Sequence, residues 1–172
     1  MKNLSSVLVV LDKPKHAQTA LARAKELQAK SGCHLSLAAF CWHPMVKSKD
    51  VFDIHQRRAI KKAIVGERRD WLRGLVLDSK LSAADVSTEV FWTGDIADWV
   101  TRASATDCDL VVKSVHHSQT LLNTPLDWQL LRACPAPIWL TAASNPGGKA
   151  RRPTGRILAA LISKTRTAFT GP

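Results

Sequence analysis

Two patterns of hydrophobic and polar positions alternate along the chain. Short apolar runs, typical of buried strands, occur at residues 7–11, 35–42, 86–92, 109–113 and 138–141. Between these runs, apolar residues recur at the three- and four-residue spacing of an amphipathic helix. Strands that alternate with helices predict a mostly parallel sheet, with right-handed crossovers and helices on both faces. We therefore expect an α/β fold, a three-layer doubly wound sandwich with five strands and four helices.

The helical segments carry start and stop signals. The first has Pro14 near its start and Gly32 near a C′ position, where a left-handed residue commonly ends a helix. The second is long, from about residue 50 to residue 78, with apolar residues on one face and basic residues on the other. The third opens at Asp95 and runs to about residue 106. The fourth begins at Thr124-Pro125, an N-cap residue followed by proline at the first helical position.

Composition divides the chain into three parts. Residues 1–143 hold the five strand patterns of the expected sheet and form one domain of ordinary size. Residues 144–155 have the glycine, proline and basic composition of a linker. Residues 156–172 begin with an apolar run similar in character to the first strand. We expect this last part to be the truncated start of a second domain, partly disordered.

The basic residues are concentrated at the C-terminal end. The net charge is +11, and residues 144–172 contain six lysines and arginines and no acidic residue. More than half of the excess positive charge therefore lies in this segment. We expect nucleic-acid binding only weakly, through this tail.

Several chemical classes are excluded by features that the sequence lacks. No apolar run approaches the roughly 20 residues of a transmembrane helix, and the N-terminal segment does not have the form of a signal peptide. We therefore expect a cytoplasmic protein without membrane association.

Cys33, Cys41, Cys108 and Cys134 are scattered without C-x-x-C spacing, which favours buried, reduced thiols. Nucleotide-loop, zinc-protease and hydrolase motifs are absent, so we expect no catalytic residues and no metal site.

Particular residues add a family resemblance to this pattern. The first strand ends in aspartate in VLVVLD, the first helix is rich in alanine, and the runs DLVVK and CPAPIWL begin at residues 109 and 134. Together these features resemble the universal stress protein (UspA-like) family over residues 4–143. The segment KSVHHSQTLLNTPLDWQLLRACPAP, residues 113–137, resembles more narrowly the tandem-domain, UspE-type branch of this family. The resemblance implies the strand order 3-2-1-4-5 and a role in the stress response. It also implies a second domain of the same kind, which would explain residues 156–172.

The resemblance further implies a ligand site at the carboxyl ends of the strands, where open α/β sheets bind their ligands. In nucleotide-binding members, an aspartate at the position of Asp12 contacts the adenosine; alternatively, Asp12 caps the first helix or orders its loop. These members follow the fourth strand with G-x2-G-x9-G-[S/T], whose glycines cradle phosphates. This chain has Ser114 and His117 at the first two glycine positions, Asn123 at the third after five intervening residues in place of nine, and Thr124 at the hydroxyl position. We therefore expect no cofactor, with ATP as the alternative.

Other polar residues near this loop leave alternatives open. Lys113 pairs with a ligand anion or with Asp12, or extends into solvent at the strand end. His116 and His117 either bind a metal or shuttle protons, or one shapes the pocket while the other is solvated. The candidate ligand-binding residues are Asp12, Phe40, Lys113, Ser114, His117, Asn123 and Thr124.

The chain has six tryptophans and no tyrosine. Three fall on inward faces and are expected in the core: Trp71, Trp99 and Trp139. Three others lie near strand ends or at the start of the last helix: Trp42, Trp92 and Trp128. These three either line an apolar cavity above the sheet or pack under loops.

The last strand should lie at the edge of the sheet in the family's strand order. An apolar edge strand invites pairing, and family members commonly dimerise through it. We expect a homodimer, or pairing with a second universal stress protein domain, through Ala136, Pro137, Ile138, Trp139 and Leu140.

These observations lead to one main function and three alternatives. The main one is a non-enzymatic, cytoplasmic stress-response protein resembling UspE, acting as a ligand-responsive or scaffolding module without the glycine-rich ATP loop. The first alternative is an ATP-binding signalling domain with weak ATPase activity. The others are nucleic-acid association through the tail, and a small apolar or amphipathic ligand held between the tryptophans and the histidine loop.

Overall fold

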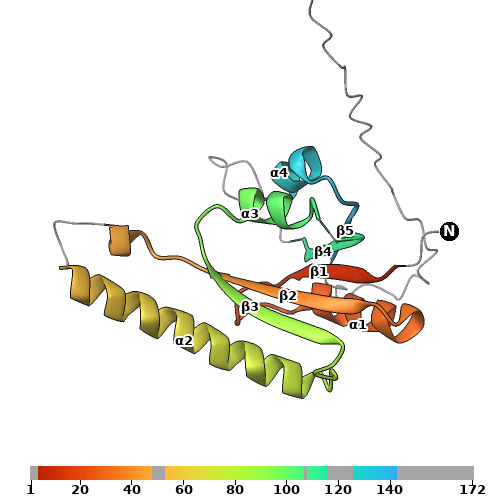
Figure 1. Cartoon of the computed structure of the whole chain (residues 1–172), viewed down its shortest axis with the longest axis horizontal. Coiled ribbons are helices and arrows are strands. Elements are labelled where there is room, and N and C mark those ends of the chain that lie inside the picture. The colour runs from red at the N-terminus through yellow and green to blue at the C-terminus, as the bar shows by residue number, and fades with distance from the viewer. Residues whose placement is uncertain (1–3, 48–52, 107, 116–125, 143–172) are drawn as a thin grey trace, which may run out of the picture.

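The five strands form one parallel sheet with helices on both of its faces in the computed structural model of the chain (Figure 1). The structure describes residues 4–47, 53–106, 108–115 and 126–142. The strand order is β3-β2-β1-β4-β5, and every neighbouring pair is parallel. The predicted fold class and strand order are confirmed.

Each strand lies within one residue of its predicted bounds. The elements are, in chain order, β1 (Ser6–Val10), α1 (Thr19–Ser31), β2 (His34–Cys41), a short 3-10 helix η1 (Pro44–Lys47), α2 (Ile54–Asp78), β3 (Val86–Trp92), α3 (Ile96–Ala103), β4 (Leu110–Ser114), α4 (Leu126–Ala133) and β5 (Ile138–Thr141).

Helix α1 begins later and ends where the sequence predicted. It starts at Thr19 rather than near Pro14, because the intervening residues form a turn in which the backbone N–H of His16 donates to the carbonyl of Lys13 (2.9 Å). It ends at Gly32, whose φ of 68° is left-handed, a conformation that favours glycine.

Aspartates open helices α2 and α3. Asp53 accepts hydrogen bonds from the backbone N–H groups of His55 and Gln56, and the Gln56 side chain accepts from the Asp53 N–H, which completes a capping box. Helix α2 therefore starts at residue 54 rather than near residue 50. Asp95 caps α3 as predicted by accepting from the backbone N–H of Asp98. The predicted start of α4 at Thr124-Pro125 lies outside the described residues.

The two faces of the sheet are covered unequally. Helices α1 and α2 lie on one face, and α3 and α4 lie on the other (Figure 1). Side chains alternate along β1, so that Val7 and Val9 enter the larger core under α1 and α2, while Leu8 and Val10 enter the smaller core. Helices α3 and α4 have only eight residues each, about 12 Å of helix. They lie above β1, β4 and β5 and leave much of the β2–β3 surface on that side uncovered (Figure 1).

The four cysteines are free thiols. Cys33 and Cys41 are buried, and Cys108 and Cys134 are half-buried. None of the described helices combines the length and apolar composition that a membrane crossing requires.

Candidate functional site

The carboxyl ends of β1 and β4 lie side by side in the middle of the sheet, with Val10 paired to Lys113. Successive strands extend the sheet in opposite directions from this point, which is where open α/β sheets bind ligands. Asp12 follows β1, and its backbone N–H donates to Oε1 of Gln18 (3.1 Å), which ties the turn before α1. Gln18 occupies the N-cap position of α1. Asp12 therefore orders the loop through its backbone and is not the helix cap.

A serine from β4 partly caps α1 instead. Ser114 is 1% exposed, and its Oγ accepts a hydrogen bond from the backbone N–H of Ala20 (3.1 Å). Ala20 lies in the first turn of α1, where backbone N–H groups have no partner within the helix. Ser114 stands where the nucleotide-binding members have their first glycine, and its hydroxyl fixes the N-terminus of α1 to the sheet.

Lys113 points into the molecule. Its Nζ lies 2.6 Å from Oδ1 of Asp127 in the first turn of α4, and it donates to the carbonyl of Ser114 (2.8 Å). The predicted extension of Lys113 into solvent is wrong, since the residue is 6% exposed. A buried ammonium needs a counter-charge, and the structure supplies it from Asp127. The sequence analysis did not single out Asp127.

Two threonines close the same edge of the sheet. The hydroxyls of Thr19 and Thr141 lie 3.2 Å apart, and the Thr141 hydroxyl also donates to the carbonyl of Lys113 (3.3 Å). The backbone N–H of Val115 donates to the carbonyl of Thr141 (2.7 Å), which continues the pairing of β4 with β5. Polar groups at the carboxyl ends of β4 and β5 and at the start of α1 therefore bind one another.

The histidine loop lies outside the described residues. His116, His117, Asn123 and Thr124 belong to it, so their roles stay predictions. Within the described ranges, no three histidine, cysteine, aspartate or glutamate residues gather as metal ligands.

Phe40 belongs to an aromatic cluster in the smaller core. Its ring meets the Trp99 ring edge-on at a centroid distance of 5.2 Å and lies 5.7 Å from the ring of Phe91. The rings of Phe91 and Trp99 are 3.9 Å apart. Contact of Phe40 with a ligand stays a prediction, and the ring packs against Phe91 and Trp99.

The tryptophans divide between core and surface. The core predictions hold for Trp71, Trp99 and Trp139, which pack against the two cores. Of the two alternatives for the other three, a single cavity lined by all of them is excluded, because Trp92 and Trp128 lie on opposite faces of the sheet. Trp92 packs on the α1–α2 side of the sheet, with Nζ of Lys61 5.6 Å from its ring centroid. Trp128 is on α4, on the opposite face, and is 61% exposed.

The sequence is similar to curated stress proteins, although no protein-family model matches it. Universal stress protein E of Photorhabdus laumondii is 27% identical over 144 residues, which cover 81% of this chain and 46% of that protein. Universal stress protein E of Escherichia coli K12 is 25% identical over 156 residues, covering 87% and 49%. The chain thus spans about half the length of the curated relatives it matches.

Solved structures share the fold at lower identity. The universal stress protein UspA from Lactobacillus plantarum matches with a TM-score of 0.60 and 14% identity, covering 81% of this chain and 99% of that one. A universal stress protein in complex with cAMP matches with a TM-score of 0.54 and 18% identity, covering 83% and 100%. The chain therefore has the fold of the universal stress proteins, and its sequence is similar to that of Universal stress protein E.

Proposed function

We propose that this chain is a non-enzymatic, cytoplasmic stress-response protein resembling Universal stress protein E. It acts as a ligand-responsive or scaffolding domain and lacks the family's usual ATP cradle. Sequence similarity to Universal stress protein E over most of the chain supports the stress-response role. The polar network at the carboxyl end of β4 supports the absence of the cradle.

This network is the observation that carries the proposal. Phosphate sites at helix N-termini use free backbone N–H groups and glycines that allow close approach. In this chain the Ser114 hydroxyl already binds the N–H of Ala20, and the Lys113 ammonium already binds Asp127. The nearby cation is therefore neutralised, and a side chain stands where the nucleotide-binding members have glycine. This network of side chains therefore supports a structural role for the end of β4 more than a role in phosphate binding.

Calorimetric titration of the full chain with ATP, ADP and cAMP tests the proposal. The expected result is no binding up to about millimolar ligand, the weak end of the usual affinity scale. The variant Ser114→Gly/His117→Gly/Asn123→Gly places glycine at the three positions that face the phosphates in nucleotide-binding members and is expected to gain ATP binding. Nucleotide binding by the unaltered chain that Asp12→Ala abolishes would contradict the proposal.

The alternative is an ATP-binding signalling domain with weak ATPase activity. It is favoured by the place of Asp12 beside the start of α1 and by the shared fold of a universal stress protein solved with cAMP. It predicts a higher melting temperature with ATP and slow phosphate release, both lost in Asp12→Ala.

We also propose that β5 is the assembly surface. Among the described residues it pairs with β4 alone, so its other edge has backbone groups that another strand can bind. Its apolar residues Ile138, Trp139 and Leu140 are half-buried. Because the chain spans about half of its curated relatives, the proposed partner is a second domain of the same kind, either another copy or another universal stress protein.

A further inference from the structure

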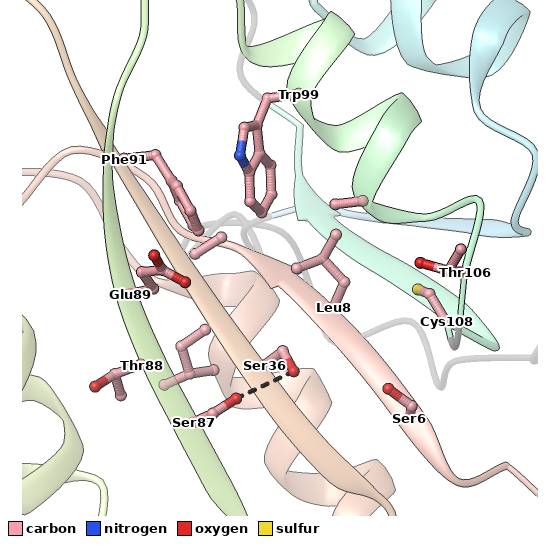
Figure 2. A pocket seen from close by; sticks show the side chains of 13 residues that line it. Ser6, Leu8, Ser36, Ser87, Thr88, Glu89, Phe91, Trp99, Thr106 and Cys108 are labelled. Atoms are coloured by element: carbon pink, nitrogen blue, oxygen red, sulfur yellow. Dashed lines mark hydrogen bonds between the residues drawn. The ribbon is translucent and has the colours of Figure 1, made fainter.

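A groove of about 300 Å³ opens on the sheet face that α3 and α4 only partly cover (Figure 2). Its volume is at the lower end of the range for small-molecule sites. The residues that matter most to its chemistry are Ser36 and Ala38 of β2, Ser87, Glu89 and Phe91 of β3, and Trp99 of α3.

Small and polar residues on β2 and β3 create the groove. Ser36 pairs with Ser87, and Ala38 pairs with Glu89, so two adjacent rows lack a large apolar side chain. A doubly wound sheet normally buries both faces under helices. Helix α3 is too short to cover these two rows, and their small and polar side chains can remain in contact with water. The residues of β2 and β3 on this face therefore form a polar groove where a covered sheet would have apolar side chains.

The head of the groove is aromatic. The rings of Phe91 and Trp99 have centroids 3.9 Å apart, and Phe40 supports Trp99 edge-on at 5.2 Å. Figure 2 shows the two rings side by side, with the indole nitrogen on the side of Phe91 and the Glu89 carboxylate below the Phe91 ring. A flat apolar group fits against such rings, and a cation near their faces gains further attraction.

Glu89 gives the groove its charge. None of the described residues that line it is lysine, arginine or histidine, although the chain has a net charge of +11. Among the described residues, Glu89 has no ion-pair partner. The other titratable lining group is the thiol of Cys108, and burial raises its pKa, so the thiol is neutral near pH 7. The groove is therefore negative and disfavours phosphates and carboxylates.

Hydroxyl groups occupy the other end. The Ser87 hydroxyl donates to the Ser36 hydroxyl (3.2 Å), and Nε2 of His34 lies 3.2 Å from the Ser87 hydroxyl. Ser6 and Thr106 also line the groove, with Thr106 beside Cys108 (Figure 2). Hydroxyls both donate and accept, so this end suits a polar substituent of a ligand.

We propose that this groove binds a small organic amine with a flat apolar body. The flat body packs against Phe91 and Trp99, the ammonium pairs with Glu89, and any further polar group binds the serine hydroxyls. The groove extends from the aromatic rings toward the amino ends of β1 and β2. It is therefore separate from the crevice of Asp12 and Ser114. Amine binding in the groove does not depend on whether the chain binds nucleotides in that crevice.

Titration of the full chain with 2-phenylethylamine, followed by ligand-observed NMR, tests the proposal. Glu89→Gln keeps the shape of the side chain and removes its charge, so it is expected to weaken amine binding about tenfold or more. The matched acid 3-phenylpropionate is expected to bind about tenfold more weakly than the amine. Glu67→Gln, which removes an exposed carboxylate from α2, should leave amine binding unchanged.

Two further measurements locate the bound amine. Cys108 lines the groove, so saturating amine should slow its alkylation by iodoacetamide, as measured by mass spectrometry. Ser36→Leu fills the floor and should abolish binding, with an unchanged circular dichroism spectrum to show that the fold persists. Equal binding by the unaltered chain, Glu89→Gln and Ser36→Leu would overturn the proposal, as would the absence of amine binding at about 10 mM, weaker than any affinity useful for recognition.

Discussion

The ammonium of Lys113 lies 2.6 Å from Oδ1 of Asp127, and both side chains are largely withdrawn from water, with exposed fractions of 7% and 16%. The pair joins the end of β4 to the first turn of α4. Buried charges attract each other with little screening, but each has lost most of its hydration. The two residues therefore stabilise the fold only together, because removal of one leaves the other charge buried alone.

Asp127→Ala is expected to lower the free energy of unfolding by about 3 kcal/mol, since it leaves the Lys113 ammonium uncompensated. Lys113→Met/Asp127→Leu should recover most of this loss, because both charges are removed. Asp70→Ala breaks the exposed pair between Asp70 and Arg73 (3.1 Å) and should cost less than about 1 kcal/mol. Urea unfolding followed by circular dichroism measures each value. A loss in Asp127→Ala no larger than in Asp70→Ala would contradict this account.

The strands could be predicted from sequence because each is a short apolar run with turn-forming residues before and after it. The start of α1 could not, because contacts from distant residues fix it together with the turn between Lys13 and His16. Ser114 binds the N–H of Ala20, and Thr141 approaches Thr19, across 94 and 122 positions of the sequence. No local periodicity contains these contacts, so the helical pattern alone extended the helix too far toward Pro14.

The site could be predicted only in part. The topology brought Asp12 and Ser114 to one edge of the sheet, as expected for the carboxyl ends of adjacent strands. The partner of Lys113 was missed because sequence does not fix how α4 is turned above the sheet. The sequence also contains a pattern that indicates the groove and that the sequence analysis did not use. Ser87 and Glu89 fall on one face of β3, where a covered sheet would have apolar residues.

Ser114→Ala is expected to lower the free energy of unfolding by about 1–2 kcal/mol, because the backbone N–H of Ala20 then loses its acceptor in a buried place. Ser82→Ala is the matched control. The Ser82 hydroxyl also accepts from a backbone N–H, that of Ala84 (3.3 Å), but in an exposed turn. Its loss should stay within about 0.5 kcal/mol. Similar losses in both variants would show that the contact to α1 contributes little.

Leu140→Lys is expected to convert a dimer formed through β5 into a monomer. A lysine on an edge strand opposes pairing with another chain. Leu140 suits the test because it belongs to neither core, whereas Ile138 and Trp139 pack into them. Thr88→Lys places the same charge on β3, the opposite edge, and should leave the dimer intact. Light scattering after size-exclusion chromatography measures the mass. A monomeric unaltered chain, or a dimer in Leu140→Lys, would contradict pairing through β5.

Burial raises the pKa of the Cys41 thiol above its ordinary value of 9.0, and the nearby cations of Arg68, Lys61 and Arg69 limit the rise. The folded protein thus holds this proton more tightly than the unfolded chain. The associated stability is complete below pH 9.0 and is lost as the pH rises from there through the folded pKa. The free energy of unfolding should therefore fall more steeply above pH 9.0 in the unaltered chain than in Cys41→Ser, whose hydroxyl does not titrate in this range. Urea unfolding at intervals between about pH 8 and pH 11 gives both slopes, and equal slopes would contradict the role of the thiol.

Arg68→Gln removes one of the cations near Cys41, so it should raise the thiol pKa further and slow the alkylation of Cys41 at a given pH.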